Sequence, residues 1–320
     1  MPDSIHQAKS GRTVGLVGLG LRGAAQGTPG QQVHDGDTIV VRAIGNFGVR
    51  LLAVDAPEIS FQLPGGTQFI AIKDPRWETF LTDPFAPGLP PFKPALYKHL
   101  IADLKIRAGA GAATNHAKHA DVAKAALLKE VVADRGELGK TNDTMQFFLS
   151  FAHDIVDRYG RLLCYINRDQ ADPKVPAPRP GTYNERLLKL GLVSPYFIWP
   201  NIDPFRKQDE LTQAVLKPGK ANHVATTEPA LASARASVAA ARQGNVGLFG
   251  GADPLRLQPF EVRFLARRQP PDRWVIDLGK GDDVLIRPQN YYRISNLEDR
   301  LYIPPEFVAL FVEAGWKREP

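Results

Sequence analysis

The sequence predicts a mixed α+β protein. Three observations support this class: short apolar runs with a period of two residues, amphipathic or alanine-rich stretches bounded by helix start and stop residues, and a long proline-rich stretch without a regular period. With 320 residues, of which 43% are hydrophobic, the chain can bury a sizeable core in one elaborated domain or in two ordinary ones. We therefore expect a soluble globular protein.

The first elements are predicted to be strands. Residues 1–12 are polar, and we expect them to be disordered. Gly18–Gly23 has the glycine spacing of a dinucleotide-binding loop, but Gly27 and Pro29 would stop the helix that such a loop must open. A glycine-rich strand and turn is the better interpretation, and a nicotinamide-dependent oxidoreductase is disfavoured.

A hairpin is predicted next. The runs 38–44 and 47–54 alternate apolar and polar residues on either side of Gly45-Asn46, a common hairpin turn. Asp37 then lies beside the start of the first strand and Asp55 at the end of the second. Because those two ends are neighbours in an antiparallel hairpin, we expect the two carboxylates to lie close together.

Residues 60–114 interrupt this regularity. Seven prolines between Pro64 and Pro94 leave few places for a helix or a central strand, although residues 96–107 can form a short helix. We expect this segment to be an insertion draped over the surface of a domain that spans residues 13–250.

Regular patterns return after the insertion. The predicted helices cover residues 116–135, 183–190 and 229–243, and the predicted strands cover 145–151 and 162–166. Beyond Gly251 the composition shifts, and residues 253–320 are expected to form a small β-rich unit. Its predicted elements are strands at 259–265, 273–278, 283–286 and 300–303 and a terminal helix at 305–314.

Several other signals are weak. Cys164 lies inside an apolar run, which favours a buried, inert thiol. His116 and His119, with His99 nearby, could suggest a metal site, but a solvated first turn of a helix is favoured. Asp277–Asp283 is interpreted as a tight turn rather than a calcium loop. No apolar run approaches membrane-spanning length and no signal peptide is evident, so we expect a cytoplasmic protein.

The most informative residues form a split set of charges. Asp35, Asp37, Arg50, Asp55 and Glu58 precede the insertion, and the turn Asp157-Arg158-Tyr159-Gly160-Arg161 follows it. Taken singly, each has an ordinary alternative, such as a turn residue, a strand-end cap or a salt-bridged arginine, and Asp35 is best interpreted as a turn carboxylate. Together, hard oxygen ligands and planar arginine donors indicate metal-assisted phosphodiester cleavage.

The chain resembles the thermonucleases, the staphylococcal nuclease family. The resemblance rests on Asp35-Gly36-Asp37-Thr38, on the Arg-x4-Asp-x2-Glu array that ends at Glu58, and on the turn 157–161. It continues through Asn184-Glu185, Gly191-Leu192 and the aromatic run 196–201, and it covers roughly residues 30–59 and 115–250. An array spread in order over three segments is more specific than one short motif.

The resemblance implies both a fold and an activity. The implied fold is a five-stranded OB-type Greek-key β-barrel with three helices. The implied activity is that of a calcium-dependent endonuclease acting on DNA or RNA, with attack at the 5′ side of the phosphodiester that leaves 3′-phosphate ends. The residues that it assigns to the reaction are Asp37, Asp55 and the backbone carbonyl of Ala56 for calcium, Glu58 for the attacking water, and Arg50 and Arg161 for the transition state.

The resemblance also implies nucleotide contacts. Arg158 and Tyr159 come from the turn, and Arg158 stands where the family has a lysine. Phe197 and Trp199 fall near the family's nucleotide-flanking tyrosines, and Tyr196 can fill either place because the alignment slips there by one residue.

This chain departs from the family in three ways. Ala56 replaces the usual threonine, the insertion replaces a mobile loop beside the active site, and the segment after Ala252 has no counterpart. The net charge of +6 suits a nucleic-acid partner. A non-catalytic nucleic-acid or protein binding scaffold is the alternative, but the catalytic set is complete, and we expect a monomeric enzyme.

Overall fold

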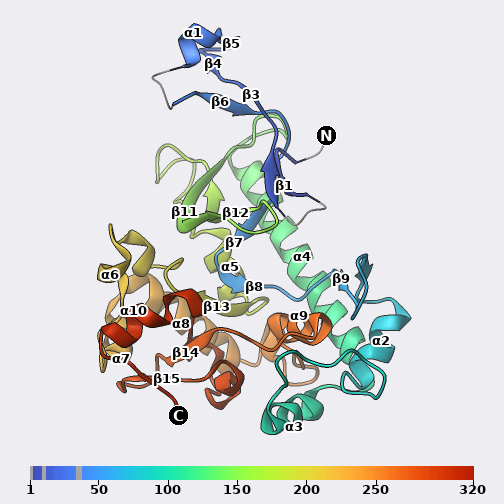
Figure 1. Ribbon diagram of the computed structural model, residues 1–320. Helices are drawn as coiled ribbons and strands as arrows, with labels where there is room; N and C mark the ends of the chain where they lie inside the picture. Colours follow the sequence, from blue (N-terminus) through green and yellow to red (C-terminus); the bar gives the residue numbers. More distant parts are fainter. Residues whose placement is uncertain (1–2, 9–11, 34–37) are drawn as a thin grey trace. The chain divides into compact units, whose positions relative to one another are not determined.

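The computed structural model describes residues 3–8, 12–33 and 38–320 (Figure 1). Its internal contacts divide the chain into two compact units. Unit 1 is Met1–Leu51 with Ser150–Tyr165, and unit 2 is Leu52–Leu149 with Ile166–Pro320. Each unit is described by itself. Asp35 and Asp37 lie outside the described residues.

Unit 1 is built from short strands. Its elements are β1 (Ile5–Gln7), β2 (Thr13–Gly15), β3 (Val17–Leu19), β4 (Leu21–Arg22), β5 (Ala25–Gln26), α1 (Pro29–Gln32), β6 (Val41–Ala43) and β7 (Val49–Leu51). Strands β11 (Phe147–Val156) and β12 (Leu162–Arg168) run from one unit into the other. β1 pairs with β2, β3 with β6 and β4 with β5, all antiparallel, while β12 lies between β11 and β7.

The glycine-rich segment of unit 1 forms strands and a turn, as predicted. β3 and β4 cover most of Gly18–Gly23, and Gly23 has a φ of +62° in the turn to β5. This left-handed conformation favours glycine because it has no Cβ. The following α1 has only four residues. Residues 5–7, which were expected to be disordered, form β1 and pair with β2.

The predicted hairpin at 38–54 is wrong. β6 pairs with β3, and β7 pairs in parallel with β12, so β6 and β7 are not partners. At the expected turn, the N–H of Ser4 donates to the Asn46 carbonyl and the Ser4 hydroxyl accepts from the N–H of Gly45. The second run is also broken: Ala53 has a φ of 64°, and the run is divided between β7 and β8.

Unit 2 holds the remaining elements. Its strands are β8 (Ala53–Asp55), β9 (Ser60–Gln62), β10 (Phe69–Ala71), β13 (Ser194–Ile198), β14 (Trp274–Asp277), β15 (Val284–Leu285), β16 (Arg300–Ile303) and β17 (Lys317–Arg318). Its α-helices are α2 (Pro75–Thr82), α3 (Lys98–Arg107), α4 (Ala112–Glu137), α5 (Tyr183–Lys189), α6 (Leu211–Ala214), α7 (Ala221–Thr227), α8 (Pro229–Gln243), α9 (Pro259–Arg267) and α10 (Val308–Glu313). Short 3-10 turns are η1 (Phe205–Lys207), η2 (Gly247–Phe249), η3 (Pro288–Arg293), η4 (Leu297–Asp299) and η5 (Pro305–Phe307).

The largest sheet has four strands in the order β14-β16-β13-β8. β13 runs parallel to β16 and antiparallel to β8, so this sheet joins segments from both ends and the middle of the chain. The protein is α+β, but the described strands form small sheets of two to four strands and no closed barrel. The predicted five-stranded OB-type barrel is therefore wrong, because closure requires every strand to have a neighbour on each side.

Helices with clear start and stop residues were predicted best. α8 covers residues 229–243 as predicted, with Pro229 in its first turn and Gly244 after its end. α5 begins at a capping box in which Thr182 accepts from the N–H of Glu185. Residues 259–265, predicted as a strand, instead form α9. Among the described helices, none has both the length and the apolar character needed to cross a membrane.

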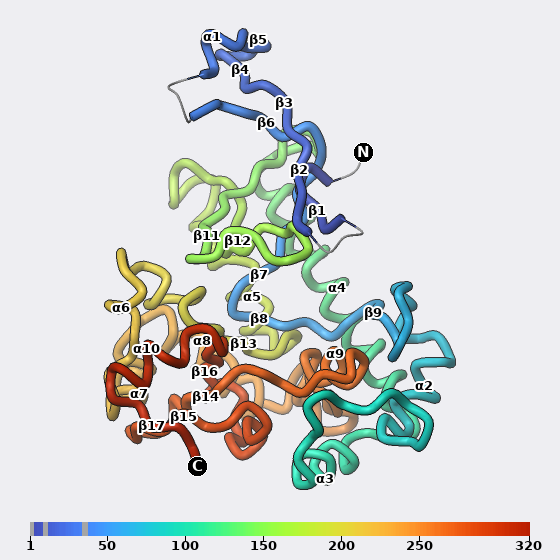
Figure 2. Tube along the Cα trace, in the orientation of Figure 1, coloured from blue at the N-terminus to red at the C-terminus, as the bar shows by residue number. Residues whose placement is uncertain are grey.

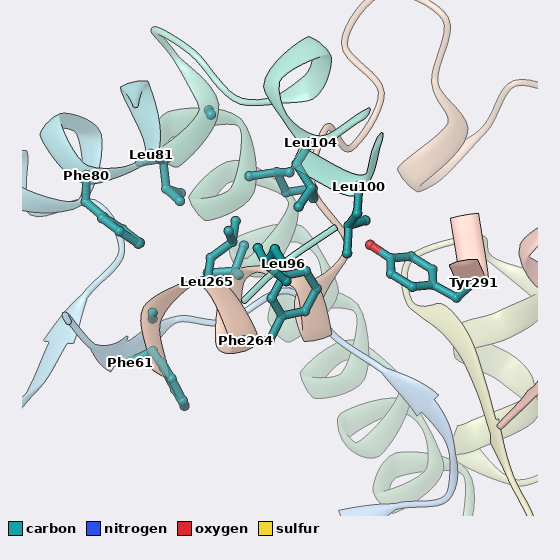
Figure 3. Packing of buried hydrophobic residues seen from close by; sticks show 14 of the residues in the cluster. Phe61, Phe80, Leu81, Leu96, Leu100, Leu104, Phe264, Leu265 and Tyr291 are labelled. Atoms are coloured by element: carbon teal, nitrogen blue, oxygen red, sulfur yellow. The ribbon is translucent and has the colours of Figure 1, made fainter. Parts of the chain in front are cut away.

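One core in unit 2 joins the insertion to the C-terminal segment (Figure 3). From residues 60–114 it buries Phe61, Ile72, Trp77, Phe80, Leu81, Leu96, Leu100, Leu104, Ala112 and Ala113; from residues 253–320 it buries Leu257, Val262, Phe264, Leu265, Ala266, Val275, Tyr291, Ile294 and Tyr302. Figure 2 shows α9 beside β9. The expectation that residues 60–114 lie over a domain surface is therefore wrong, since their apolar side chains build this core.

Candidate functional site

Asp55 ends a buried strand, as the sequence analysis placed it. β8 pairs antiparallel with β13, which puts Asp55 opposite Ser194, and Asp55 is only 2% exposed. The buried carboxamide of Asn184 holds the start of the strand: its Nδ2 donates to the Leu52 carbonyl over 2.9 Å, and its Oδ1 accepts from the N–H of Ile166 over 3.2 Å. β8 is thereby tied to β12 and α5.

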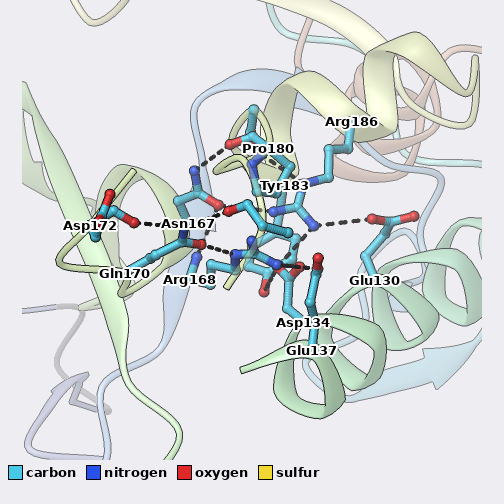
Figure 4. A network of polar contacts seen from close by, with 12 residues as sticks. Glu130, Asp134, Glu137, Asn167, Arg168, Gln170, Asp172, Pro180, Tyr183 and Arg186 are labelled. Carbon is cyan, nitrogen blue, oxygen red and sulfur yellow. Dashed lines mark hydrogen bonds and ion pairs between the residues drawn. The ribbon is translucent and has the colours of Figure 1, made fainter. Parts of the chain in front are cut away.

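A buried polar network fixes α5 itself (Figure 4). The Asp134 carboxylate on α4 accepts from the hydroxyl of Tyr183 over 2.7 Å and pairs with Arg186 and with the fully buried Arg168. Such a network costs free energy when it is broken, because each remaining charge is left buried without its partner. Asn184 therefore projects from a helix that is held firmly within unit 2.

The carboxylates of Asp55 and Glu58 converge on one guanidinium group, that of Arg263 on α9. Nη1 of Arg263 lies 2.9 Å from Oδ1 of Asp55 and 2.6 Å from Oε1 of Glu58. Nη2 lies 2.7 Å from Oδ2 of Asp55. Burial lowers the pKa of Arg263, but the two carboxylate charges outweigh it and raise the pKa overall.

His116 fixes the backbone between the two carboxylates. The N–H of Glu58 donates to Nε2 of His116 over 2.8 Å. Burial lowers the pKa of His116 to about 4, although Asp55 and the backbone of Leu257 oppose the shift. The imidazole is therefore neutral near pH 7 and can accept this bond.

The predicted solvated position of the two α4 histidines is wrong. His116 is 1% exposed and His119 is 7% exposed, and Nε2 of His119 lies 2.9 Å from the Asp253 carbonyl. Both rings are covered because α4 packs against the segment that leads into α9. Over residues 3–8, 12–33 and 38–320, no three His, Cys, Asp or Glu side chains gather so as to hold a metal ion.

The described residues of this cluster do not fit a calcium ion as they are arranged. Both oxygens of Asp55 and one of Glu58 face the Arg263 guanidinium at hydrogen-bond distance. A divalent cation on those oxygens would meet a fixed positive charge a few ångströms away, in a buried place where repulsion is weakly screened. Ala56, whose carbonyl the resemblance assigns to calcium, is exposed beside this cluster.

The aromatic run lies in the core of unit 2. Phe197 is 1% exposed and Trp199 is 0% exposed, and the indole N–H of Trp199 donates to the Ala214 carbonyl over 2.8 Å. Tyr196 stacks on Phe260 with centroids 5.6 Å apart, and Nη1 of Arg273 donates to its hydroxyl over 2.9 Å. These covered rings hold the sheet in place rather than presenting a face on which a base could stack.

The second group of predicted site residues lies in unit 1, on the turn between β11 and β12. Oδ1 of Asp157 accepts from the N–H groups of Tyr159 and Arg161, at 2.9 and 3.1 Å, and its Oδ2 pairs with the Arg161 guanidinium at 2.7 Å. Nη2 of Arg158 donates to the hydroxyl of Tyr159 over 2.7 Å. The predicted turn is confirmed; Arg158 is exposed, and Tyr159 and Arg161 are half-buried.

Arg50 also belongs to unit 1. It lies on β7 opposite Leu163 of β12. The structure thus brings Arg158, Tyr159 and Arg161 together in unit 1, and Asp55 with Glu58 in unit 2.

The sequence analysis missed Arg263, because nothing local marks a pairing over more than 200 residues. One signal was present for the helix that carries it: Pro259 follows Gln258, and Glu261 stands three positions after Gln258, which is a helix-start pattern. Comparisons of the chain with protein-family models, with curated proteins and with solved structures found no match in any of the three.

Proposed function

We propose that this protein is a nuclease that hydrolyses phosphodiester bonds in DNA or RNA. The observation that carries the proposal is the convergence of the Asp55 and Glu58 carboxylates at the end of β8, with the Glu58 side chain 22% exposed. Unit 1 by itself offers Arg158, Tyr159 and Arg161 on one turn, and these are donors that can hold the phosphates of a nucleic acid.

The role that we propose for unit 2 is proton transfer. Hydrolysis needs a water that loses a proton as it attacks the phosphorus. The Glu58 side chain is 22% exposed, so water can reach its carboxylate and transfer a proton to it. Within unit 1, the Arg161 side chain is 37% exposed and offers a planar guanidinium that can bind a phosphate of the nucleic acid, and Arg50 is proposed for the same binding role. By the resemblance, cleavage would leave 3′-phosphate ends.

The test measures cleavage of defined DNA and RNA substrates, single-stranded and double-stranded, by the full chain, with added calcium and with chelator. We expect cleavage by the wild-type chain and a rate lower by roughly 100- to 10,000-fold in Glu58→Gln, because the variant cannot accept the proton from water. Glu313→Gln, at an exposed position of α10, is the matched control and should cleave at the wild-type rate. Equal rates in folded Glu58→Gln and wild type would remove Glu58 from the reaction.

A second candidate function is a non-catalytic module that binds nucleic acid. It is favoured by Arg263, which already pairs with both carboxylates, and by the net charge of +6. Intact substrates under all conditions, together with binding that weakens steeply as salt rises, would support this alternative over the nuclease.

A further inference from the structure

Arg263 occupies the place between two carboxylates where a bound cation would lie. It makes three hydrogen bonds of 2.6 to 2.9 Å to Asp55 and Glu58, two of them as a planar fork on Asp55. Forked guanidinium bonds to a carboxylate are among the strongest polar contacts in proteins. The side chains of Arg263 and Asp55 are 12% and 2% exposed, so little water competes for these bonds.

The helix that carries Arg263 is held rigidly. At the start of α9, Glu261 accepts from the N–H of Gln258 over 2.7 Å, and the Gln258 amide oxygen accepts from the Ser194 hydroxyl over 2.6 Å. The buried Glu261 carboxylate also pairs with Arg107 at 2.5 Å and accepts from the hydroxyl of Tyr291 at 2.5 Å. Arg263 therefore projects from a helix, α9, that is fixed by these contacts.

The charges around the cluster leave little room for a further cation. Two carboxylates face Arg263, and Arg273 on a neighbouring segment adds a second positive charge that acts on Arg263. Arg263 alone balances the charge of one of the two carboxylates. A divalent ion added beside it would give this group of side chains a large positive excess.

We propose that Arg263 is the built-in cation of the Asp55 and Glu58 site, and that it and a divalent cation are mutually exclusive occupants of these carboxylates. Removal of the guanidinium takes this cation away from the buried Asp55 and the half-buried Glu58, whose carboxylates are the hard oxygen ligands that calcium prefers. The inference goes beyond the proposed nuclease activity and is tested by cation binding alone, so either can fail without the other.

The experiment titrates the full chain with calcium chloride, by calorimetry and by thermal melting, in wild type, Arg263→Gln and the double variant Arg263→Gln with Asp55→Asn. Calcium should bind Arg263→Gln at least ten-fold more tightly than wild type and raise its melting temperature further, because a ligand of the folded state stabilises it. The double variant should lose the gain. Arg267→Gln, on the same helix and stacked over Phe61, is the control and should bind calcium like wild type.

The outcome that overturns the proposal is equal calcium affinity in wild type and Arg263→Gln, or a gain that survives Asp55→Asn. If Arg263→Gln does not fold, Arg263→Met takes its place, since methionine keeps much of the side-chain length and removes the charge. A gain in calcium affinity of ten-fold or more for Arg263→Met supports the proposal, and no gain overturns it.

Discussion

The two units each hold an aspartate paired with an arginine at 2.7 Å, and the pairs differ in burial and in sequence separation. In unit 2, Asp55 and Arg263 are more than 200 residues apart in sequence and lie almost out of water. In unit 1, Asp157 and Arg161 are four residues apart on one turn, and Arg161 is 37% exposed. The first pair exists only because several segments pack together, whereas the second belongs to a short stretch of chain.

The burial of each pair determines how much it contributes to the stability of its unit. A buried ion pair that loses one partner leaves an uncompensated charge in a place of low dielectric, while an exposed pair exchanges its partner for water at little cost. The buried Asp–Arg pair therefore stabilises unit 2, whereas the exposed Asp–Arg pair of unit 1 only shapes a surface turn.

The largest expected effect is the loss of the buried arginine. Arg263→Gln should lower the free energy of unfolding by about 3–5 kcal/mol, because the buried carboxylate of Asp55 loses its forked cation and the half-buried Glu58 loses the same partner. Arg161→Gln, at the exposed turn, should lower it by about 0–1 kcal/mol. Urea denaturation followed by circular dichroism measures both values. Similar losses in the two variants would mean that burial does not separate the pairs.

The pH dependence of stability is a second test of the buried site in unit 2, through His116. The ordinary pKa of a histidine is 6.5, and burial lowers that of His116 to about 4. Between these values the unfolded chain binds a proton that the folded chain does not. The free energy of unfolding should therefore fall as pH falls through this window, by about 3 kcal/mol in total.

His116→Gln should remove this part of the pH dependence, since a glutamine oxygen can still accept the bond from Glu58 and does not titrate. His153→Gln, at an exposed strand position, should leave it in place. Urea unfolding at a series of pH values from 4 to 7.5 measures the difference, and parallel curves for wild type and His116→Gln would contradict the assignment.

A further prediction concerns the backbone of the turn that carries the Asp157–Arg161 pair. Gly160 has a φ of +86°, and a Cβ there would lie 2.7 Å from the backbone of β1. Gly160→Ala should therefore lower the free energy of unfolding by about 1–3 kcal/mol. Gly136→Ala is the matched control, because Gly136 is helical with open space around its Cβ position, and it should be neutral or slightly stabilising. Thermal melting of both variants separates the two outcomes, and a Gly160→Ala variant as stable as Gly136→Ala would show that the turn tolerates a side chain.

Elements whose ends are marked by capping or turn residues could be predicted from the sequence. The bounds of α8 follow from Pro229 and Gly244, those of α5 from the Thr182 capping box, and the turn after β11 from Asp157 and Gly160. Strand pairing could not be predicted in the same way. Runs that look like a hairpin at 38–54 pair elsewhere, because residues near Ser4 take up the hydrogen bonds at the expected turn.

The candidate site divides along the same line. The local position of the candidate residues follows from the sequence alone: Asp55 at the end of a strand, Glu58 after a stiff proline step, and Arg161 in a turn. Only the tertiary structure decided that α9 delivers Arg263 to the two carboxylates and that His116 is buried against them. Short-range hydrogen bonds and backbone preferences depend on a few neighbouring residues. The partner of a buried charge depends instead on the packing of segments far apart in the chain.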